Sequence, residues 1–222
     1  MSATTADTAA RAEVSRHLQE CPIVAVLRAP DASDYDRVVD VLVERGIRSI
    51  ELTLTTPATL DRLPAIADRY GTDAEIGIGT VTGLDAAQAA IAAGADYLVT
   101  PVLDREVIAL AADAGVAVFP GALSPTEVFA AWSAGATAVK IFPAQTVGAQ
   151  YGAHLRGPFP DLRFIPSGGV GLDDVAAWLR AGASAVSLGG PLLGDALGGG
   201  SLDALAERCV RAVALVGEER AR

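Results

Sequence analysis

Cysteine and histidine are scarce in this chain of 222 residues, which contains two of each: Cys21, Cys209, His17 and His154. Two cysteines provide neither a disulfide framework nor the ligand spacing of a zinc site, and this usage is typical of a protein from a reducing cytoplasm. The two histidines lie far apart in the sequence, with no carboxylate cluster at ligand spacing. We interpret both as solvated helix residues and expect no metal site.

Long apolar segments and clusters of basic residues are also missing. No uninterrupted apolar segment reaches the ~20 residues that a membrane span needs. Residues 1–20 lack the apolar core of a signal peptide; we expect residues 1–12 to be frayed and a short helix to follow at 14–20. The net charge of −10 argues against nucleic acid or an anionic membrane as the main partner. The sequence therefore predicts a soluble, cytoplasmic protein.

Lysine is the rarest basic residue, because Lys140 is the one lysine among 17 basic residues and the other sixteen are arginine. It interrupts the apolar run 137–143, where a charged side chain is unexpected. Arginine stays protonated, whereas a lysine desolvated in an apolar pocket has a lowered pKa and attacks a carbonyl group to form a Schiff base. A general preference for arginine codons would also leave few lysines. Lys140 is the first candidate for chemistry, and the second explanation stays open at this point.

Short runs rich in β-branched residues alternate with alanine-rich helical stretches along the whole chain. Strands are expected at 23–28, 49–54, 75–80, 97–100, 116–120, 138–142, 163–167 and 185–188. Helices are expected at 32–45, 57–70, 84–93, 104–114, 124–133, 148–155, 171–181 and 202–216. Strands that alternate with helices of this length predict parallel βαβ units.

A recurring glycine supports units of similar size. Gly46, Gly94, Gly115, Gly135 and Gly182 each follow an expected helix and precede an expected strand. Glycine ends helices in the left-handed conformation at low cost, so we expect helix C-caps at these positions. Eight such units favour a single α/β domain over residues 13–222, folded as a (β/α)8 TIM barrel. An open doubly wound sheet is the alternative, since periodicity does not reveal closure.

Catalytic groups of a TIM barrel project from the C-terminal ends of its strands, and several polar residues are expected there. Glu51 is the second candidate, because it interrupts a strand of otherwise branched and small side chains. A carboxylate beside a desolvated lysine forms an acid/base pair that moves protons for a Schiff-base intermediate. The alternative is a buried structural ion pair between Glu51 and Lys140 or Arg28.

Glycine pairs follow the last two expected strands, in the segments 167–171 and 188–190. Many barrels bind phosphate at this position through backbone N–H groups, and glycine lets the backbone approach an anion closely. Turns also need glycine, so the pairs alone are a weak signal. We interpret the glycine-rich stretch 194–200 as a loop between the eighth strand and the last helix.

The ordered segments around these residues resemble the 2-keto-3-deoxy-6-phosphogluconate (KDPG) and 4-hydroxy-2-oxoglutarate (KHG) aldolase family. The resemblance rests on IVAVLR at 23–28, IELTL at 50–54, GIGTV at 77–81, VTP at 99–101, VKIFP at 139–143, GPFP at 157–160 and SGGV at 167–170. It covers nearly the whole chain after about residue 20. Each motif is short, but their order and spacing are specific.

The resemblance implies a class I pyruvate aldolase that needs no metal or other cofactor. Lys140 would form the Schiff base and Glu51 would act as the general acid/base. The other expected substrate-binding residues are Arg28 and Thr80 around the anionic substrate, Pro101 and Phe142 around pyruvate, Thr55 and Ser167, and Gly168, Gly169, Gly189 and Gly190 around a phosphate. The partner would be a small 2-oxo acid, phosphorylated at its far end. Family members commonly assemble as homotrimers, so a homotrimer is expected.

Two departures bear on the substrate. Some family members carry arginine where this chain has Thr55, and others carry serine where this chain has Pro191. Weaker phosphate binding would follow, which keeps the unphosphorylated 4-hydroxy-2-oxoglutarate open as a substrate. The galacto epimer of KDPG also stays open, because the sequence does not reveal which C4 epimer is preferred. Two other classes of function also remain open: a phosphate-binding isomerase or synthase that uses Lys140 only as a charge, and a sugar-phosphate binding module without catalysis.

Overall fold

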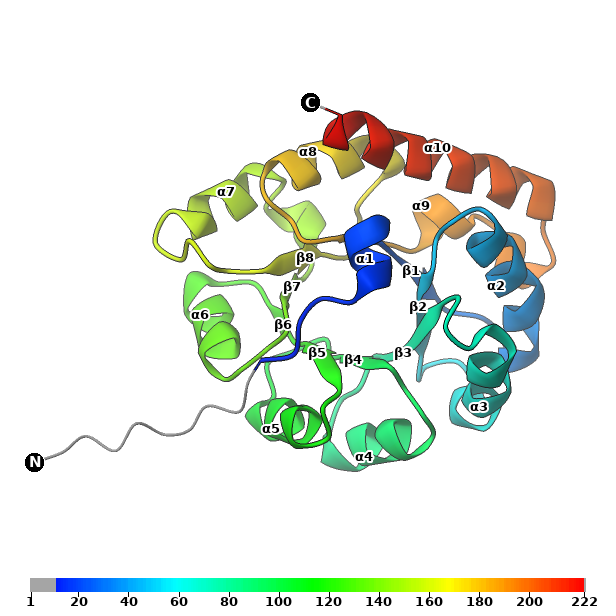
Figure 1. Cartoon of the computed structure of the whole chain (residues 1–222), viewed down its shortest axis with the longest axis horizontal. Coiled ribbons are helices and arrows are strands. Elements are labelled where there is room, and N and C mark those ends of the chain that lie inside the picture. The colour runs from blue at the N-terminus through cyan, green and yellow to red at the C-terminus, as the bar shows by residue number, and fades with distance from the viewer. Residues whose placement is uncertain (1–10, 222) are drawn as a thin grey trace, which may run out of the picture.

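Parallel strands surrounded by helices form the framework of the computed structural model, which describes residues 11–221 (Figure 1). The strands are β1 (Ile23–Leu27), β2 (Ser49–Thr53), β3 (Glu75–Gly79), β4 (Tyr97–Val99), β5 (Ala117–Phe119), β6 (Gly121–Ala122), β7 (Val139–Ile141), β8 (Phe164–Pro166) and β9 (Val186–Leu188). The α-helices are α1 (Arg16–Glu20), α2 (Tyr35–Glu44), α3 (Thr59–Tyr70), α4 (Leu84–Ala92), α5 (Arg105–Asp113), α6 (Pro125–Ser133), α7 (Gln150–Arg156), α8 (Val175–Arg180), α9 (Gly190–Leu193) and α10 (Leu202–Arg220). Short 3-10 turns are η1 (Ala32–Asp34), η2 (Ala144–Thr146), η3 (Leu172–Asp174) and η4 (Ala196–Gly198).

The strands form two parallel sheets that curl around a common centre. The larger sheet has the order β5-β4-β3-β2-β1-β9, and the smaller one has the order β6-β7-β8. Backbone hydrogen bonds cross both gaps between the sheets: Thr137 N–H donates to Val118 O at 3.0 Å, and Ser184 N–H donates to Phe164 O at 2.9 Å. The predicted α/β class with parallel strands is confirmed. The helices lie outside the curled sheets, which differs from an open sheet covered on both faces (Figure 1).

The expected fifth strand, 116–120, is divided in two. Pro120 has no N–H group and cannot donate to a strand ladder. It separates β5, which pairs with β4, from β6, which pairs with β7. The Pro120 carbonyl still accepts a hydrogen bond of 2.9 Å from the Lys140 N–H. This division places the boundary between the two sheets at Pro120.

The expected helices are present, with ends that differ by a few residues. All five glycines that we expected to end helices have positive φ, namely 88° at Gly46, 92° at Gly94, 69° at Gly115, 104° at Gly135 and 92° at Gly182. The prediction that left-handed glycines end these helices is confirmed, and each glycine lies one residue beyond the C-cap. The short helix α9 was not expected, because its sequence of glycine, proline and two leucines carries no helical period.

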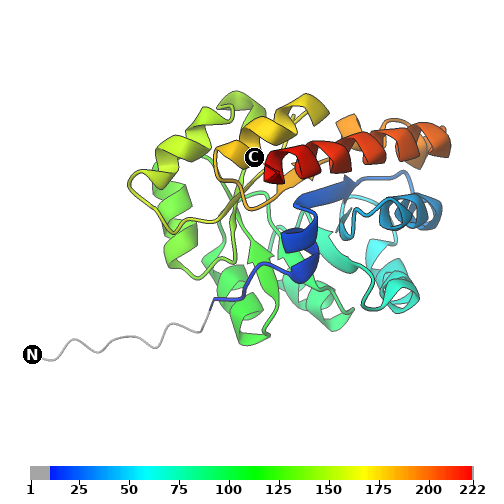
Figure 2. The same cartoon turned by 45° about the horizontal axis from the view of Figure 1, so that its top comes forward.

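Two apolar clusters divide the core. The larger cluster fills the space between the sheets and the surrounding helices. The smaller cluster occupies the inside of the curled sheets and consists of Leu18, Val24, Tyr97, Val99, Phe119, Ala138, Ile165 and Ala185. Leu18 comes from α1, which lies across the N-terminal ends of the strands (Figures 1 and 2).

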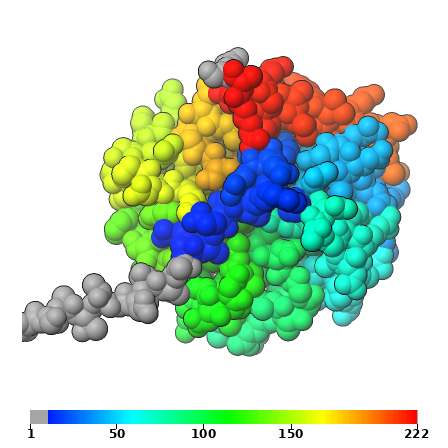
Figure 3. Space-filling model, viewed as in Figure 1, coloured from blue at the N-terminus to red at the C-terminus, as the bar shows by residue number. Residues whose placement is uncertain are grey.

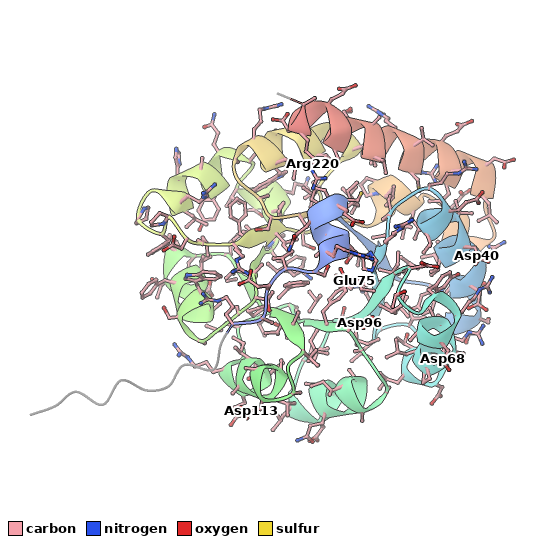
Figure 4. The ribbon with its side chains drawn as sticks, in the orientation of Figure 1. Asp40, Asp68, Glu75, Asp96, Asp113 and Arg220 are labelled. Atoms are coloured by element: carbon pink, nitrogen blue, oxygen red, sulfur yellow. The ribbon has the colours of Figure 1, made fainter. Side chains whose placement is uncertain are left out.

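The chain before β1 covers this end of the molecule, as the space-filling view shows (Figure 3). Glu75, which accepts a hydrogen bond of 2.8 Å from the Ser15 hydroxyl, lies beside α1 (Figure 4). Arg220 at the end of α10 donates to the Glu20 carbonyl at 2.5 Å. The Arg11 guanidinium lies 3.4 Å from the centroid of the Trp132 ring. Of the segment expected to be frayed, residues 1–10 lie outside the described residues.

Among the described residues, no helix combines the length and the apolar character that crossing a bilayer would require.

Candidate active site

A cavity of about 470 Å³ opens at the C-terminal ends of the strands, opposite the end that α1 covers. It is lined by Val26, Arg28, Glu51, Thr80, Pro101, Lys140, Phe142, Ser167, Gly168, Gly169, Val170, Ser187, Gly189, Gly190 and Pro191. Residues from both sheets contribute, so the curled arrangement brings together side chains that are far apart in the sequence. This is the end of a parallel α/β fold where ligands bind.

Lys140 lies in the middle of β7 and is 8% exposed. Its ammonium nitrogen lies 5.0 Å from the centroid of the Phe142 ring, within the range of a cation–π contact. No described carboxylate lies within 4.0 Å of this nitrogen. A buried lysine without an ion-pair partner is unusual, because burial of an isolated charge is costly. The amine is thus held in the cavity beside the Phe142 ring and without a carboxylate partner.

Glu51 lies in the middle of β2 and is 1% exposed. Its Oε2 atom is buried, and it accepts a hydrogen bond from none of the described residues. Burial raises the pKa of this carboxyl above its ordinary value, and the positive charges of Lys140 and Arg28 offset part of that effect. The alternative of a structural ion pair is not supported, since neither cation lies within 4.0 Å of Glu51 among the described ion pairs. A carboxyl with these properties suits a general acid that also serves as a base.

Three hydroxyl groups and one guanidinium surround this pair. Thr80, Ser167 and Ser187 line the cavity, and their hydroxyl groups make no hydrogen bond to the described residues. Thr80 has φ of 60°, a left-handed conformation that is strained for a β-branched residue. Arg28 follows the end of β1 and is exposed at the mouth of the cavity. These groups remain available to a polar ligand.

The backbone after β8 and β9 presents N–H groups to the cavity. The N–H groups of Gly168, Gly169, Val170, Gly189 and Gly190 donate to no acceptor among the described residues. Gly168 and Gly169 have φ of 86° and 75°, and a Cβ atom on them would lie 2.9 Å from the Phe142 ring and 2.2 Å from the Gln145 Oε1 atom. Unpaired N–H groups of this kind form anion sites.

The structure brings all but one of the expected site residues to this cavity. Thr55 is the exception: it is exposed, and its hydroxyl lies 3.1 Å from that of Thr53. The cavity also contains Val26, Val170 and Ser187, which were not expected there, and Pro191, which the sequence marked only as a departure from the family. Strand alternation could have revealed Ser187, because side chains two residues apart share a face and Gly189 was already a candidate.

The described histidines lie away from this cavity. His17 belongs to α1 at the opposite end, where its Nδ1 atom is buried without a hydrogen-bond partner, and His154 is exposed on α7. His17 is therefore less solvated than expected. The described residues contain no group of three or more His, Cys, Asp and Glu side chains that could hold a metal ion.

The curled parallel sheets and the buried Lys140 and Glu51 at their C-terminal end define an α/β enzyme. Comparison with known proteins then identifies the family, since the sequence model described as KDPG and KHG aldolase matches residues 14–205. The chain belongs to this family.

Individual relatives agree. The chain is 36% identical over 172 residues to the 2-dehydro-3-deoxy-6-phosphogalactonate aldolase of Escherichia coli (strain K12), covering 77% of this chain and 84% of that protein. It is 34% identical over 169 residues to the 2-dehydro-3-deoxy-phosphogluconate aldolase of Treponema pallidum (strain Nichols), covering 75% and 78%. A solved structure described as native KDPGal superposes with a TM-score of 0.85 at 33% identity, covering 90% of this chain and 97% of the other.

Proposed function

We propose that this chain is a class I aldolase that cleaves KDPG into pyruvate and D-glyceraldehyde 3-phosphate through a Schiff base on Lys140. The proposal is carried by one observation: a buried lysine without an ion-pair partner shares a cavity with a buried carboxyl whose Oε2 atom accepts no hydrogen bond. The names of the relatives support this chemistry, because those proteins are aldolases for phosphorylated 2-oxo acids.

The first steps make the imine. The Lys140 amine adds to the C2 carbonyl to give a carbinolamine. Protonated Glu51 then gives its proton to the C2 hydroxyl, which leaves as water, and the product is a protonated imine beside a Glu51 carboxylate. The raised pKa of Glu51 supports this order, because the carboxyl must hold its proton until the carbinolamine has formed.

The next steps break the carbon–carbon bond. The Glu51 carboxylate accepts the proton of the C4 hydroxyl while the C3–C4 bond cleaves, and the imine takes up the electron pair as an enamine. Glyceraldehyde 3-phosphate leaves first. Glu51 then returns its proton to C3, and hydrolysis of the imine releases pyruvate. Each proton that Glu51 takes is given back within one cycle.

The far end of the substrate would lie on the unpaired N–H groups of Gly168, Gly169, Gly189 and Gly190, which suits a phosphate. Arg28 and Thr80 would bind the anionic substrate and its carboxylate, Ser167 would donate a hydrogen bond, and Pro101 and Phe142 would enclose the pyruvate moiety. Thr55 has no place in this scheme, because it does not line the cavity.

We also infer the architecture in which this site works. Residues 13–222 would form one domain, in which the two sheets join into a closed (β/α)8 barrel. The hydrogen bonds across both gaps support closure. We propose that the enzyme acts as a homotrimer in the cytoplasm, with no metal or other cofactor. The unpaired cysteines, Cys21 and Cys209, support a reducing compartment.

Borohydride reduction in the presence of pyruvate tests the mechanism. The intact protein should acquire one reduced pyruvate adduct, and peptide mass spectrometry should place it on Lys140. Lys140→Arg keeps the positive charge but loses the nucleophile, so neither adduct nor cleavage should remain. If Lys140 stays unmodified and the arginine variant retains turnover, Lys140 acts only as a charge, as in an isomerase or synthase. Binding of KDPG without turnover would instead indicate a binding module.

The role of Glu51 and the choice of substrate need separate measurements. Glu51→Gln should still form the borohydride adduct, but more slowly because the proton for loss of water is missing, and it should lose most KDPG cleavage. Unchanged cleavage would remove Glu51 from the mechanism. The galacto epimer of KDPG and 4-hydroxy-2-oxoglutarate are the competing substrates, and the phosphogalactonate relative supports the first of them. Values of kcat/KM for the three compounds, measured side by side, decide between them.

A further inference from the structure

Ser187 is a serine of the cavity wall that none of the steps above uses. It lies in the middle of β9, is 6% exposed and lines the same cavity as Lys140 and Glu51. Its hydroxyl group makes no hydrogen bond to the described residues, whereas the buried hydroxyls of Ser49 and Thr53 both do. The Ser187 Oγ atom is not among the described buried atoms that lack a hydrogen-bond partner, so it is open to the cavity. The cavity-facing position of Ser187 lets a ligand or water supply that partner.

The strand registers place Ser187 on the same face of the sheet as Glu51. Ser187 pairs with Val24 of β1, and Glu51 pairs with Val26 of the same strand. Side chains two residues apart on a strand point to the same face, and so do residues paired across neighbouring strands. Ser187 and Glu51 therefore both point toward the inside of the curled sheet.

The stagger of the strands brings Ser187 to the height of the catalytic pair. In an eight-stranded barrel with a shear of 8, equal height corresponds to a shift of about one residue per strand. Ser187 lies two strands away from Glu51, because β1 stands between β9 and β2. The β1 partner of Ser187 is Val24, which lies two residues before Val26, the β1 partner of Glu51. This offset of two residues over two strands corresponds to equal height. This step rests on the closed barrel proposed above.

Layers inside such barrels take one side chain from every second strand. By this stagger, the layer at this height would comprise Glu51 of β2, Val99 of β4, Lys140 of β7 and Ser187 of β9. In this order around the barrel, Ser187 stands between Lys140 and Glu51, and Val99 stands opposite. Ser187 is thus the third polar member of the catalytic layer, at the position between the nucleophile and the acid.

We propose that the Ser187 hydroxyl binds the C2 oxygen as it changes from carbonyl to carbinolamine hydroxyl to departing water. The hydroxyl would donate a hydrogen bond to that oxygen while Glu51 delivers the proton that completes the water molecule. In hydrolysis the same water is held against the imine carbon, Glu51 takes its proton, and the carbinolamine re-forms. Ser187 gains and loses no proton overall, so atoms and charges balance as in the steps above.

Two measurements with pyruvate alone isolate the loss and re-addition of the C2 oxygen from the cleavage of the carbon–carbon bond. The exchange of oxygen-18 from the C2 carbonyl of labelled pyruvate into water reports the rate of imine formation and hydrolysis. The final yield of borohydride adduct at saturating pyruvate reports the equilibrium amount of imine. A hydrogen bond to the departing oxygen changes the rate in both directions, whereas a distorted cavity would change the yield as well.

In Ser187→Ala we expect oxygen exchange to slow by about tenfold, the scale of one lost hydrogen bond, with adduct yield and KM little changed. Ser187→Cys keeps the volume and replaces the hydroxyl by a weak donor, so it should slow exchange similarly. Ser184→Ala makes the same change three residues earlier, at a half-buried position outside the cavity, and should exchange at the rate of the unaltered protein.

The outcomes separate the two proposals. If the unaltered protein neither exchanges oxygen nor forms the adduct, the Schiff-base function itself is wrong. If it does both and the alanine and cysteine variants of Ser187 exchange at its rate, the role of Ser187 is overturned. A fall in adduct yield that parallels the fall in exchange would also overturn it, because Ser187 would then only support the shape of the cavity.

Discussion

Gly79 decides where the carboxyl group of Glu51 can lie. A Cβ atom added to Gly79 would lie 1.9 Å from the Oε1 atom and 2.5 Å from the Cδ atom of Glu51. The two residues belong to neighbouring strands, with Thr53 of β2 paired to Gly79 of β3. The missing side chain on β3 therefore makes room for the Glu51 side chain of β2.

Substitution of Gly79 should thus act through Glu51. In Gly79→Ala the carboxyl must move by more than an ångström, and we expect kcat/KM for cleavage to fall by about 10²-fold. Formation of the pyruvate adduct on Lys140 should persist. Gly83→Ala is the matched control, because a Cβ atom there meets nothing within 4 Å. Equal activities of the two variants would show that the position of Glu51 is not limiting.

The buried carboxyl of Glu51 also predicts a dependence of stability on pH. Its pKa is raised in the folded protein because burial disfavours the charged form. The stability that the neutral carboxyl contributes is fully present below the unfolded pKa, near 4.5, and is lost as the pH rises through the folded pKa. Glu51→Gln removes this titration, so its Tm minus that of the unaltered protein should increase with pH and then level off.

Thermal unfolding of both proteins from about pH 4 to pH 9 measures this difference in Tm. The titratable groups that both proteins contain contribute equally to the two Tm values, so their effects cancel in the difference. Glu75 and Asp96, whose pKa values are also raised by burial, are present in both proteins. A difference that does not change with pH would mean that Glu51 titrates normally in the folded state.

At the scale of single residues, the sequence pointed to the chemistry but not to the whole cavity. Lys140 and Glu51 stood out because charged residues interrupted apolar runs. Ser187 did not, since serine is common in every context and its unpaired hydroxyl is visible only once its neighbours are placed. Thr55 was expected because some family members carry arginine at its position, but the chain has turned outward there and the side chain is exposed.

Among the elements, α1 has a role that its five residues alone do not suggest. Leu18 is its one buried side chain, and it completes the apolar cluster inside the curled sheets. Most of this cluster lies between α1 and the cavity that contains Lys140 and Glu51. The helix therefore closes the end of the strands opposite the cavity.

Truncation of this side chain should cost stability and leave chemistry largely intact. We expect Leu18→Ala to lower the free energy of unfolding by about 2 to 5 kcal/mol, the range for a buried leucine that leaves a cavity. Urea denaturation measures the change. Arg16→Ala on the same helix removes a side chain that is 70% exposed and should change stability by less than about 1 kcal/mol. A similar small effect in both variants would mean that α1 does not contribute to the core.

The sequence predicted the positions of the helices and strands more completely than it predicted which strands pair with each other. Periodicity of branched residues and glycine caps located strands and helices because those signals are local. The split at Pro120 was missed, since the expected strand 116–120 ended on the proline and the two residues of β6 beyond it were not recognised. The order of strands in the two sheets depends on long-range pairing, for which the sequence carries no periodic signal.

At the scale of the whole molecule, the cavity connects the two sheets. Glu51 and Thr80 come from the six-stranded sheet and the turn after it, whereas Lys140 and Ser167 come from the three-stranded sheet and its following loop. The complete set of contacts exists only when both sheets are folded and placed together. A ligand that spans the cavity should therefore stabilise the folded chain as a unit.

Inorganic phosphate provides the test, because it should occupy the N–H groups after β8 and β9. At 100 times its Kd it should stabilise the fold by about 2.7 kcal/mol, which raises Tm by roughly 5 to 11 °C at this chain length. Potassium chloride at equal ionic strength is the control for screening. In Gly169→Ala, the added Cβ atom would lie 2.2 Å from Gln145 Oε1 at a φ of 75°, so the shift with phosphate should shrink while pyruvate still stabilises the protein. An undiminished phosphate shift in this variant would place the anion elsewhere and leave the far end of the substrate without its proposed site.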